Sequence, residues 1–188
     1  MEQSTKLLGG ISYIVLIVFG FVGIAAFPLH LITLAAAICV LVAFIQGGNQ
    51  LGRPEVKNNV ITALVLYIVA VVLFIFTVGL GLMTTIMTGG LGAVTFGAGM
   101  IIGGIIGWIL AIVAAWFWYK ASVALTEATG VSLYKIGGLL IFIGAILLIV
   151  GIGVILIFVG EILQCIAFFS TPEKGAVTAS APPQAPAV

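Results

Sequence analysis

Charged side chains are scarce in this chain: only 6% of its 188 residues are Asp, Glu, Lys or Arg, whereas 63% are hydrophobic. A soluble domain carries about 25% charged residues because its surface faces water. Here the polar side chains are too few to cover a globule, so lipid must solvate most of the surface. The net charge of +1 and the lack of a basic cluster also exclude a nucleic-acid-binding protein, which needs Lys and Arg to neutralise phosphates.

Residues that carry enzymatic or metal chemistry are also rare. The chain has one His and two Cys, and Cys39 and Cys165 match no CxxC or Cys/His spacing of a metal site. No second carboxylate accompanies Glu161 in the apolar runs, and no Ser or Cys has a candidate base, which excludes the usual hydrolytic arrangements. The glycine-rich "GGLGAVTFG" lacks the Gly-Lys-Ser/Thr ending of a phosphate loop. We therefore expect a non-enzymatic protein without a cofactor.

Long apolar runs without polar alternation predict an all-α protein, a polytopic bundle of transmembrane helices rather than a barrel. Residues 136–169 form one unbroken run. A single helix of that length would be about 51 Å long and would need a tilt above about 50°, outside the usual range. We expect a break at "VGIGV", Val150 to Val154, because two glycines permit a reversal. The predicted spans are residues 7–26, 29–45, 60–83, 100–120, 134–150 and 153–169.

Positive charge predicts the orientation of these six spans. The N-terminal segment, the loops after the second and fourth helices, and the C-terminus share one side of the membrane. These segments contain every Lys and Arg of the chain: Lys6, Arg53, Lys57, Lys120, Lys135 and Lys174. By the positive-inside rule both termini are cytoplasmic. We expect a multi-pass protein of the plasma membrane.

Two segments lie outside the predicted spans. The uncharged, glycine-rich stretch Thr84 to Gly99, "TTIMTGGLGAVTFGAG", predicts a flexible outer loop, with a re-entrant element shielded by protein as the alternative. Residues 171–188 have the Pro, Ala and Ser content of a disordered tail. The transmembrane domain is therefore expected to comprise residues 1–170.

Small residues recur at helical spacing along the fourth and fifth predicted helices. Residues four or seven apart share one face, and a smooth face lets transmembrane helices approach closely. The partner helix belongs either to the same chain or to a second copy or a larger membrane complex. The two stripes consist of Gly99, Gly103, Gly107, Ala111 and Ala115, and of Gly137, Gly144 and Gly151.

Glu161 is a carboxylate inside an apolar run, "ILIFVGEILQCIAFFS". Gln164 and Cys165, three and four residues later, share its helix face and extend a short polar strip. An ionised carboxylate in hydrocarbon costs several kcal/mol, so Glu161 is expected to face the bundle interior with a partner or to stay protonated. The expected neighbours are Thr77, Tyr67, Gln164 or a freed backbone carbonyl.

His30 follows Pro28 at the outer start of the second predicted helix. We interpret it as an interfacial residue, with pH sensing or a proton step as the alternative.

Two functions follow from these candidates. The first is a non-enzymatic scaffold or accessory subunit, which needs a dry, well-packed bundle. The alternative is a small transporter or channel that uses Glu161, which needs a polar cavity lined by several helices.

Two stretches of the chain resemble a known family. "STKLLGGI" near the start, and "TGVSLYKIGGLLIFIGAILLIV" followed by "AFFS" near the end, are similar to an archaeal membrane-protein family catalogued as domain of unknown function 996. The resemblance covers residues 4–170. It implies an archaeal, multi-spanning plasma-membrane protein, and it brings neither an established activity nor catalytic residues.

Overall fold

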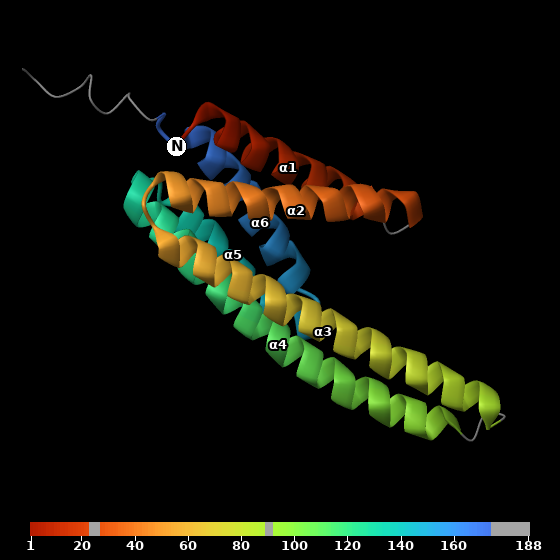
Figure 1. The fold of residues 1–188 in the computed structure, drawn as a ribbon. Helices are drawn as coiled ribbons and strands as arrows, with labels where there is room; N and C mark the ends of the chain where they lie inside the picture. Colours follow the sequence, from red (N-terminus) through yellow and green to blue (C-terminus); the bar gives the residue numbers. More distant parts are fainter. Residues whose placement is uncertain (23–26, 89–91, 174–188) are drawn as a thin grey trace, which may run out of the picture.

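The computed structural model describes residues 1–22, 27–88 and 92–173. Within these ranges the chain is helical and has no strand, which confirms the all-α prediction (Figure 1). Of the predicted tail, residues 174–188 lie outside the described residues. The helices are α1 (Gln3–Val22), α2 (Phe27–Gln50), α3 (Pro54–Met87), α4 (Gly92–Thr129), α5 (Leu133–Leu147), the short 3₁₀ turn η2 (Leu148–Val150) and α6 (Gly153–Ser170).

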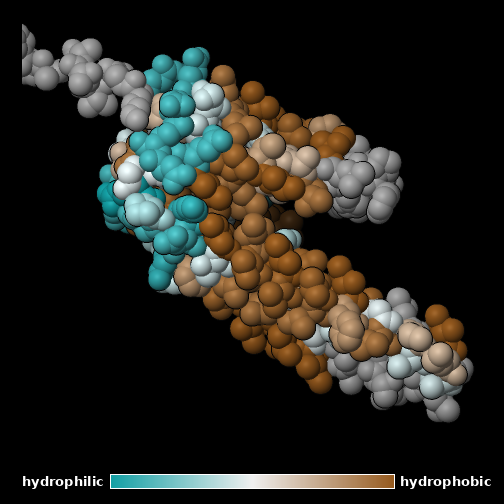
Figure 2. Space-filling view, viewed as in Figure 1, coloured by the Kyte–Doolittle hydropathy of each residue, from teal (hydrophilic) through white to brown (hydrophobic). Residues whose placement is uncertain are grey.

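Most of these helices are long and apolar enough to cross a membrane. In the described part of the chain, five segments meet that description, and Gln3–Phe19 of α1 is a shorter apolar helix. The five are Ile32–Gln50, Pro54–Met87, Met100–Thr129, Leu133–Val150 and Gly153–Ser170. Their outward surfaces are hydrophobic as well (Figure 2). These features are consistent with a membrane protein.

Consecutive helices pair as the hairpins α1–α2, α3–α4 and α5–α6, and the hairpins form a ring because α2 also packs on α3, α4 on α5 and α6 on α1 (Figure 1). An aromatic core lies inside the ring. The Phe44 ring of α2 lies 4.5 Å from Trp118 of α4 and 5.4 Å from Phe168 of α6, centroid to centroid. Tyr134 of α5 packs on the same Phe168 ring at 5.3 Å. We call this region the packed half of the bundle.

Hydrophilic residues gather at one end of the molecule, the polar end, which holds the N-terminus (Figure 2). Polar contacts between separate segments hold this end together. They are Met1 N to the Pro172 carbonyl (3.2 Å), Glu2 N to Gln50 Oε1 (2.8 Å), Lys6 Nζ to Glu173 Oε1 (3.8 Å) and Arg53 Nη1 to Glu127 Oε2 (3.5 Å). The N-terminal segment therefore meets both the end of α2 and the last described residues at this end.

The break between the last two helices is where the sequence predicts it. Gly151 follows η2 with φ of 81°, in the left-handed region that favours glycine. Its N–H donates to the Leu148 carbonyl at 3.0 Å. The chain therefore turns here, and α5 and α6 pack against each other.

The third and fourth helices are longer than predicted. α3 continues to Met87 and α4 begins at Gly92, so most of the expected outer loop at residues 84–99 is helical, and the loop prediction is wrong for that part. Thr84 and Thr85 each donate their hydroxyl to the Gly81 carbonyl at 2.9 Å, which satisfies these side chains within the helix. Lys120 also lies inside α4 rather than in a loop, because α4 continues to Thr129.

The α3–α4 hairpin runs well beyond the ends of α5 and α6 (Figure 1). We call its outer part, residues 71–87 and 92–108, the α3–α4 arm. Large apolar side chains on both of its helices are exposed. Examples are Phe76 (64%), Ile86 (80%), Ile101 (65%) and Ile102 (61%).

Candidate functional site within the membrane

Gln164 of α6 lies at the centre of a buried hydrogen-bond network that joins three helices. Its side chain is 0% exposed. Its Oε1 accepts hydrogen bonds from the Tyr13 hydroxyl of α1 and from Trp118 Nε1–H of α4, the latter at 3.2 Å. Its Nε2 donates to Ser122 Oγ at 3.0 Å, and Ser122 Oγ donates to the Trp118 carbonyl at 3.0 Å. Both acceptor positions of the Gln164 oxygen are thus occupied.

This network links the positions of α1, α4 and α6. A buried amide without partners costs about 1–3 kcal/mol, so any displacement that separates these helices loses several bonds at once. In the hydrocarbon region no water replaces a lost partner. Gln164 therefore acts as a polar anchor of the bundle.

Two glycines of α5 provide the space for this anchor. A Cβ at Gly137 would lie 2.8 Å from Gln164 Cγ and 2.7 Å from the Gly160 carbonyl oxygen. A Cβ at Gly138 would lie 2.7 Å from Ser122 Oγ. Any larger residue at these positions would push α5 away from α4 and α6.

A second glycine contact between α5 and α6 lies about two helical turns further from the polar end. A Cβ at Gly144 would lie 2.8 Å from the Gly153 carbonyl, and one at Gly153 would collide with the Gly144 carbonyl. Of the predicted second stripe, Gly137 and Gly144 thus face α6. Gly151 instead forms the turn, and no described atom beyond its two chain neighbours lies within 4 Å of its Cβ position.

The predicted stripe on α4 faces α3 in part. A Cβ at Gly103 would lie 2.5 Å from Thr77 Oγ1, and one at Gly107 would lie 3.7 Å from the Ala70 carbonyl, an ordinary contact. Ala115 is buried, and Ala111 is partly buried. The surroundings of Gly99 lie outside what the structure describes.

Glu161 lies one turn from Gln164 and is partly buried. The Tyr13 hydroxyl group is within electrostatic reach of its carboxyl group, yet Glu161 makes no hydrogen bond or ion pair to any residue that the structure describes. The expected neighbours have other surroundings: Thr77 donates to the Leu73 carbonyl at 2.6 Å, and Tyr67 is 58% exposed. Glu161 is therefore a carboxyl group inside an apolar helix without a polar partner among these residues.

The other two predicted polar residues lie apart from Glu161. Cys165 Sγ donates to the Gly10 carbonyl of α1 at 3.4 Å and is buried, so it contributes to helix packing. His30 belongs to α2, but its side chain lies outside the described part of the chain. Within that part, no group of three or more His, Cys, Asp or Glu is placed to hold a metal ion.

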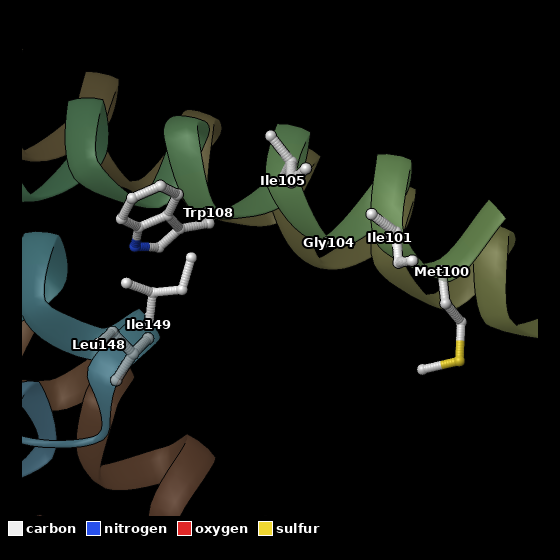
Figure 3. Close-up of a pocket in the computed structure, with 7 residues that line it drawn as sticks. All are labelled: Met100, Ile101, Gly104, Ile105, Trp108, Leu148 and Ile149. Atoms are coloured by element: carbon white, nitrogen blue, oxygen red, sulfur yellow. The ribbon is translucent and has the colours of Figure 1, made fainter. Parts of the chain in front are cut away.

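An apolar pocket of about 510 Å³ lies between α4 and the α5–α6 turn (Figure 3). Its lining residues are Met100, Ile101, Gly104, Ile105, Trp108, Leu148 and Ile149. The Trp108 Nε1–H, the one side-chain donor among them, donates to the Ala145 carbonyl at 2.8 Å. The pocket therefore offers apolar surface and no titratable group.

The sequence placed Gln164 beside Glu161 but did not identify the partners of Gln164. Tyr13 and Trp118 come from other helices, 151 and 46 residues away. The glycines Gly153 and Gly160, which meet the predicted stripe, were also missed. Their seven-residue spacing matches that of Gly137 and Gly144, and this shared spacing could have identified them as packing positions.

Comparison with known proteins places the chain in a family. The model of a family described as "Protein of unknown function (DUF996)" matches residues 32–162, more than half of the chain. The chain belongs to the DUF996 family. It is also 31% identical over 171 residues to an uncharacterized protein of the archaeon Methanocaldococcus jannaschii, and the match covers 91% of this chain and 93% of that protein. No solved structure matches the chain. The family resemblance read from the sequence is confirmed.

Proposed function

We propose that this DUF996 protein is a non-enzymatic plasma-membrane scaffold or accessory subunit, with six spans and both termini in the cytoplasm. The α3–α4 arm is the surface through which it assembles with a second copy of the chain. The exposed apolar side chains of this arm are the observation that carries the proposal. Ile101 and Phe76, from its two helices, are 65% and 64% exposed.

The length of the hairpin supports a protein partner. No charged residue occurs between Lys57 and Lys120, and the apolar part of α3, from Val60 to Met87, is about 40 Å long at the helical rise. A hydrocarbon core of about 30 Å covers that length only at a tilt of about 41°, just beyond the usual range of about 0–40°. A second copy that packs along the arm would cover apolar surface that lipid covers poorly.

The interior of the packed half also favours a scaffold. Gln164 uses both acceptor positions of its oxygen within the protein, and α5 and α6 meet backbone to backbone at Gly137 and Gly160. A pathway for a polar substrate needs several polar groups that are free to bind it. The network around Gln164 is instead occupied by its own side chains.

Single-molecule photobleaching in liposomes tests this proposal. We expect wild-type protein to show two bleaching steps at dilutions where random co-occupancy is negligible. Ile101→Trp should yield single steps, because a bulky side chain disrupts a packed interface but is tolerated in lipid. Ile14→Trp, at a 47% exposed position of α1, is the matched control and should leave two steps. Wild-type protein that bleaches in one step would contradict assembly with a second copy.

A second candidate, a small transporter or channel, is favoured by Glu161 alone. Intramembrane carboxyl groups commonly mark ion or proton pathways, and Glu161 has no polar partner among the described residues. Proteoliposome flux measurements of wild-type protein and Glu161→Gln distinguish the candidates. A proton or cation flux that the substitution abolishes, with the fold intact, would favour the transporter over the scaffold.

A further inference from the structure

Lys120 differs from the other basic residues of the described chain in having aromatic rings next to its ammonium group. It lies inside α4, nine residues before that helix ends at Thr129, and its side chain is exposed. Its ammonium group lies 5.5 Å from the ring centroids of both Trp116 and Phe117. Lys120 forms no ion pair with any residue in the described ranges, whereas Arg53 pairs with both Glu55 and Glu127.

With the polar end in water, Lys120 lies about one headgroup layer deeper along α4 than the residues of that end. Glu127 is seven residues further along the same side of the helix, about 10 Å nearer the polar end, where Arg53 contacts it at 3.5 Å. The headgroup layer on each side of a bilayer is about 5–8 Å thick. With the Arg53–Glu127 pair in water, Lys120 lies at the inner boundary of that layer, and its long stem can extend toward phosphates.

The rings next to Lys120 form an aromatic surface across two helices. Trp116 of α4 is 40% exposed, and its ring lies 5.6 Å from Tyr119 and 5.2 Å from Phe142 of α5, centroid to centroid. Amphipathic aromatic rings favour the membrane interface. This surface offers apolar contact directly below a cation.

We propose that Lys120, Trp116 and Phe142 form a binding site for an anionic phospholipid. The Lys120 ammonium binds the lipid phosphate, and the first part of an acyl chain covers the rings of Trp116 and Phe142. Charge complementarity selects an anionic lipid, because no carboxylate of the described residues pairs with this cation and a zwitterionic lipid brings a competing cation of its own. This site is separate from the α3–α4 arm and does not depend on the proposed assembly.

Tryptophan quenching by brominated lipids tests the site. The protein is reconstituted in phosphatidylcholine with a small fraction of either brominated phosphatidylglycerol or brominated phosphatidylcholine. The signal that is lost in Trp116→Phe identifies the contribution of Trp116. We expect brominated phosphatidylglycerol to occupy the site about fivefold more readily, since one basic side chain near the bilayer surface contributes about 1 kcal/mol toward anionic lipid.

Substitutions of lysine sharpen the test. Lys120→Gln should remove the fivefold preference, and Lys120→Arg should retain it. Lys135→Gln is the matched control, since Lys135 is also exposed near the polar end but has no aromatic ring beneath its ammonium group in the described part of the chain. Equal quenching by the two brominated lipids in wild-type protein would overturn the proposal. A preference that survives Lys120→Gln would also overturn it, and would assign the selectivity to other basic residues.

Discussion

The packed half of the bundle and the α3–α4 arm are built from equally apolar sequence but are held in different ways. In the packed half, buried rings and the Gln164 network join helices from all three hairpins. In the arm, α3 and α4 pack on each other, and large side chains such as Ile86 and Ile101 face outward. Hydrophobicity alone therefore does not decide packing in lipid. Close glycine contacts join helix pairs in both regions, at Gly103 in the arm and at Gly160 in the packed half, because the hydrophobic effect does not pull helices together there. The packed half adds the buried network of Gln164, which joins three helices.

Gln164→Leu should have the largest effect of the substitutions in this comparison. It removes the partner of the Tyr13 hydroxyl, the Trp118 indole N–H and the Ser122 hydroxyl. We expect a loss of about 2–3 kcal/mol in the free energy of unfolding, measured by unfolding in bicelles. The matched change in the arm, Thr77→Val, should cost about 0.5 kcal/mol or less, because among the described residues the Thr77 hydroxyl bonds to its own helix, at the Leu73 carbonyl. Equal losses would remove the distinction between the two regions.

Gly160→Ala should have the next largest effect. Its new Cβ would lie 2.7 Å from the Gly137 carbonyl, and an overpacked contact of this kind costs about 1–3 kcal/mol. Gly104→Ala in the arm is the control, since no described atom beyond its own stretch of helix backbone lies within 4 Å of that Cβ position and alanine favours a helix over glycine. The melting temperature in detergent should therefore decrease for Gly160→Ala, and it should stay unchanged or increase for Gly104→Ala. The opposite order would show that α5 and α6 do not approach closely.

Glu161→Gln should change stability by less than about 1 kcal/mol. The amide is nearly isosteric with the carboxyl group, and no hydrogen bond or ion pair to the described residues is lost. A scaffold also retains its assembly after this change, which photobleaching in liposomes measures. A loss as large as that of Gln164→Leu would show that Glu161 belongs to the polar anchor.

Glu127→Gln should have the smallest effect. The Arg53–Glu127 pair spans 3.5 Å, with side chains 36% and 58% exposed, and exposed pairs contribute about 0–1 kcal/mol. We expect a change of less than about 0.5 kcal/mol in the same bicelle unfolding measurement, and a smaller one at high salt. A loss above about 2 kcal/mol would mean that the polar end, rather than the packed half, stabilises the fold.

The sequence predicted those features that follow from length and charge. Residues 136–169 are too long for one span, and the structure breaks that run at Gly151. The ends of α3 and α4 were not predictable in the same way. Glycine and threonine are frequent in loops, and at residues 84–87 and 92–99 the pairing of two long helices and hydroxyl bonds such as Thr84 to Gly81 favour the helical form.

The site was predictable only where its members share a helix. Gln164 and Cys165 follow Glu161 along one face of α6, and their spacing identified the strip. The partners of Gln164 come from α1 and α4, and no local pattern specifies which face of a distant helix will meet it. For the same reason, the contact of Gly137 with Gly160 depends on how α5 and α6 pack after the turn.

Cysteine cross-linking in membranes tests most directly the claim that the α3–α4 arm is an assembly surface. Cys39 and Cys165 are replaced by Ala, and single cysteines are introduced as Ile101→Cys in the arm and Ile14→Cys in α1. Both positions are exposed, at 65% and 47% respectively, so both are open to an oxidant. We predict a disulfide-linked dimer for Ile101→Cys and monomer for Ile14→Cys. Monomer at both positions, or a dimer only through α1, would contradict the account.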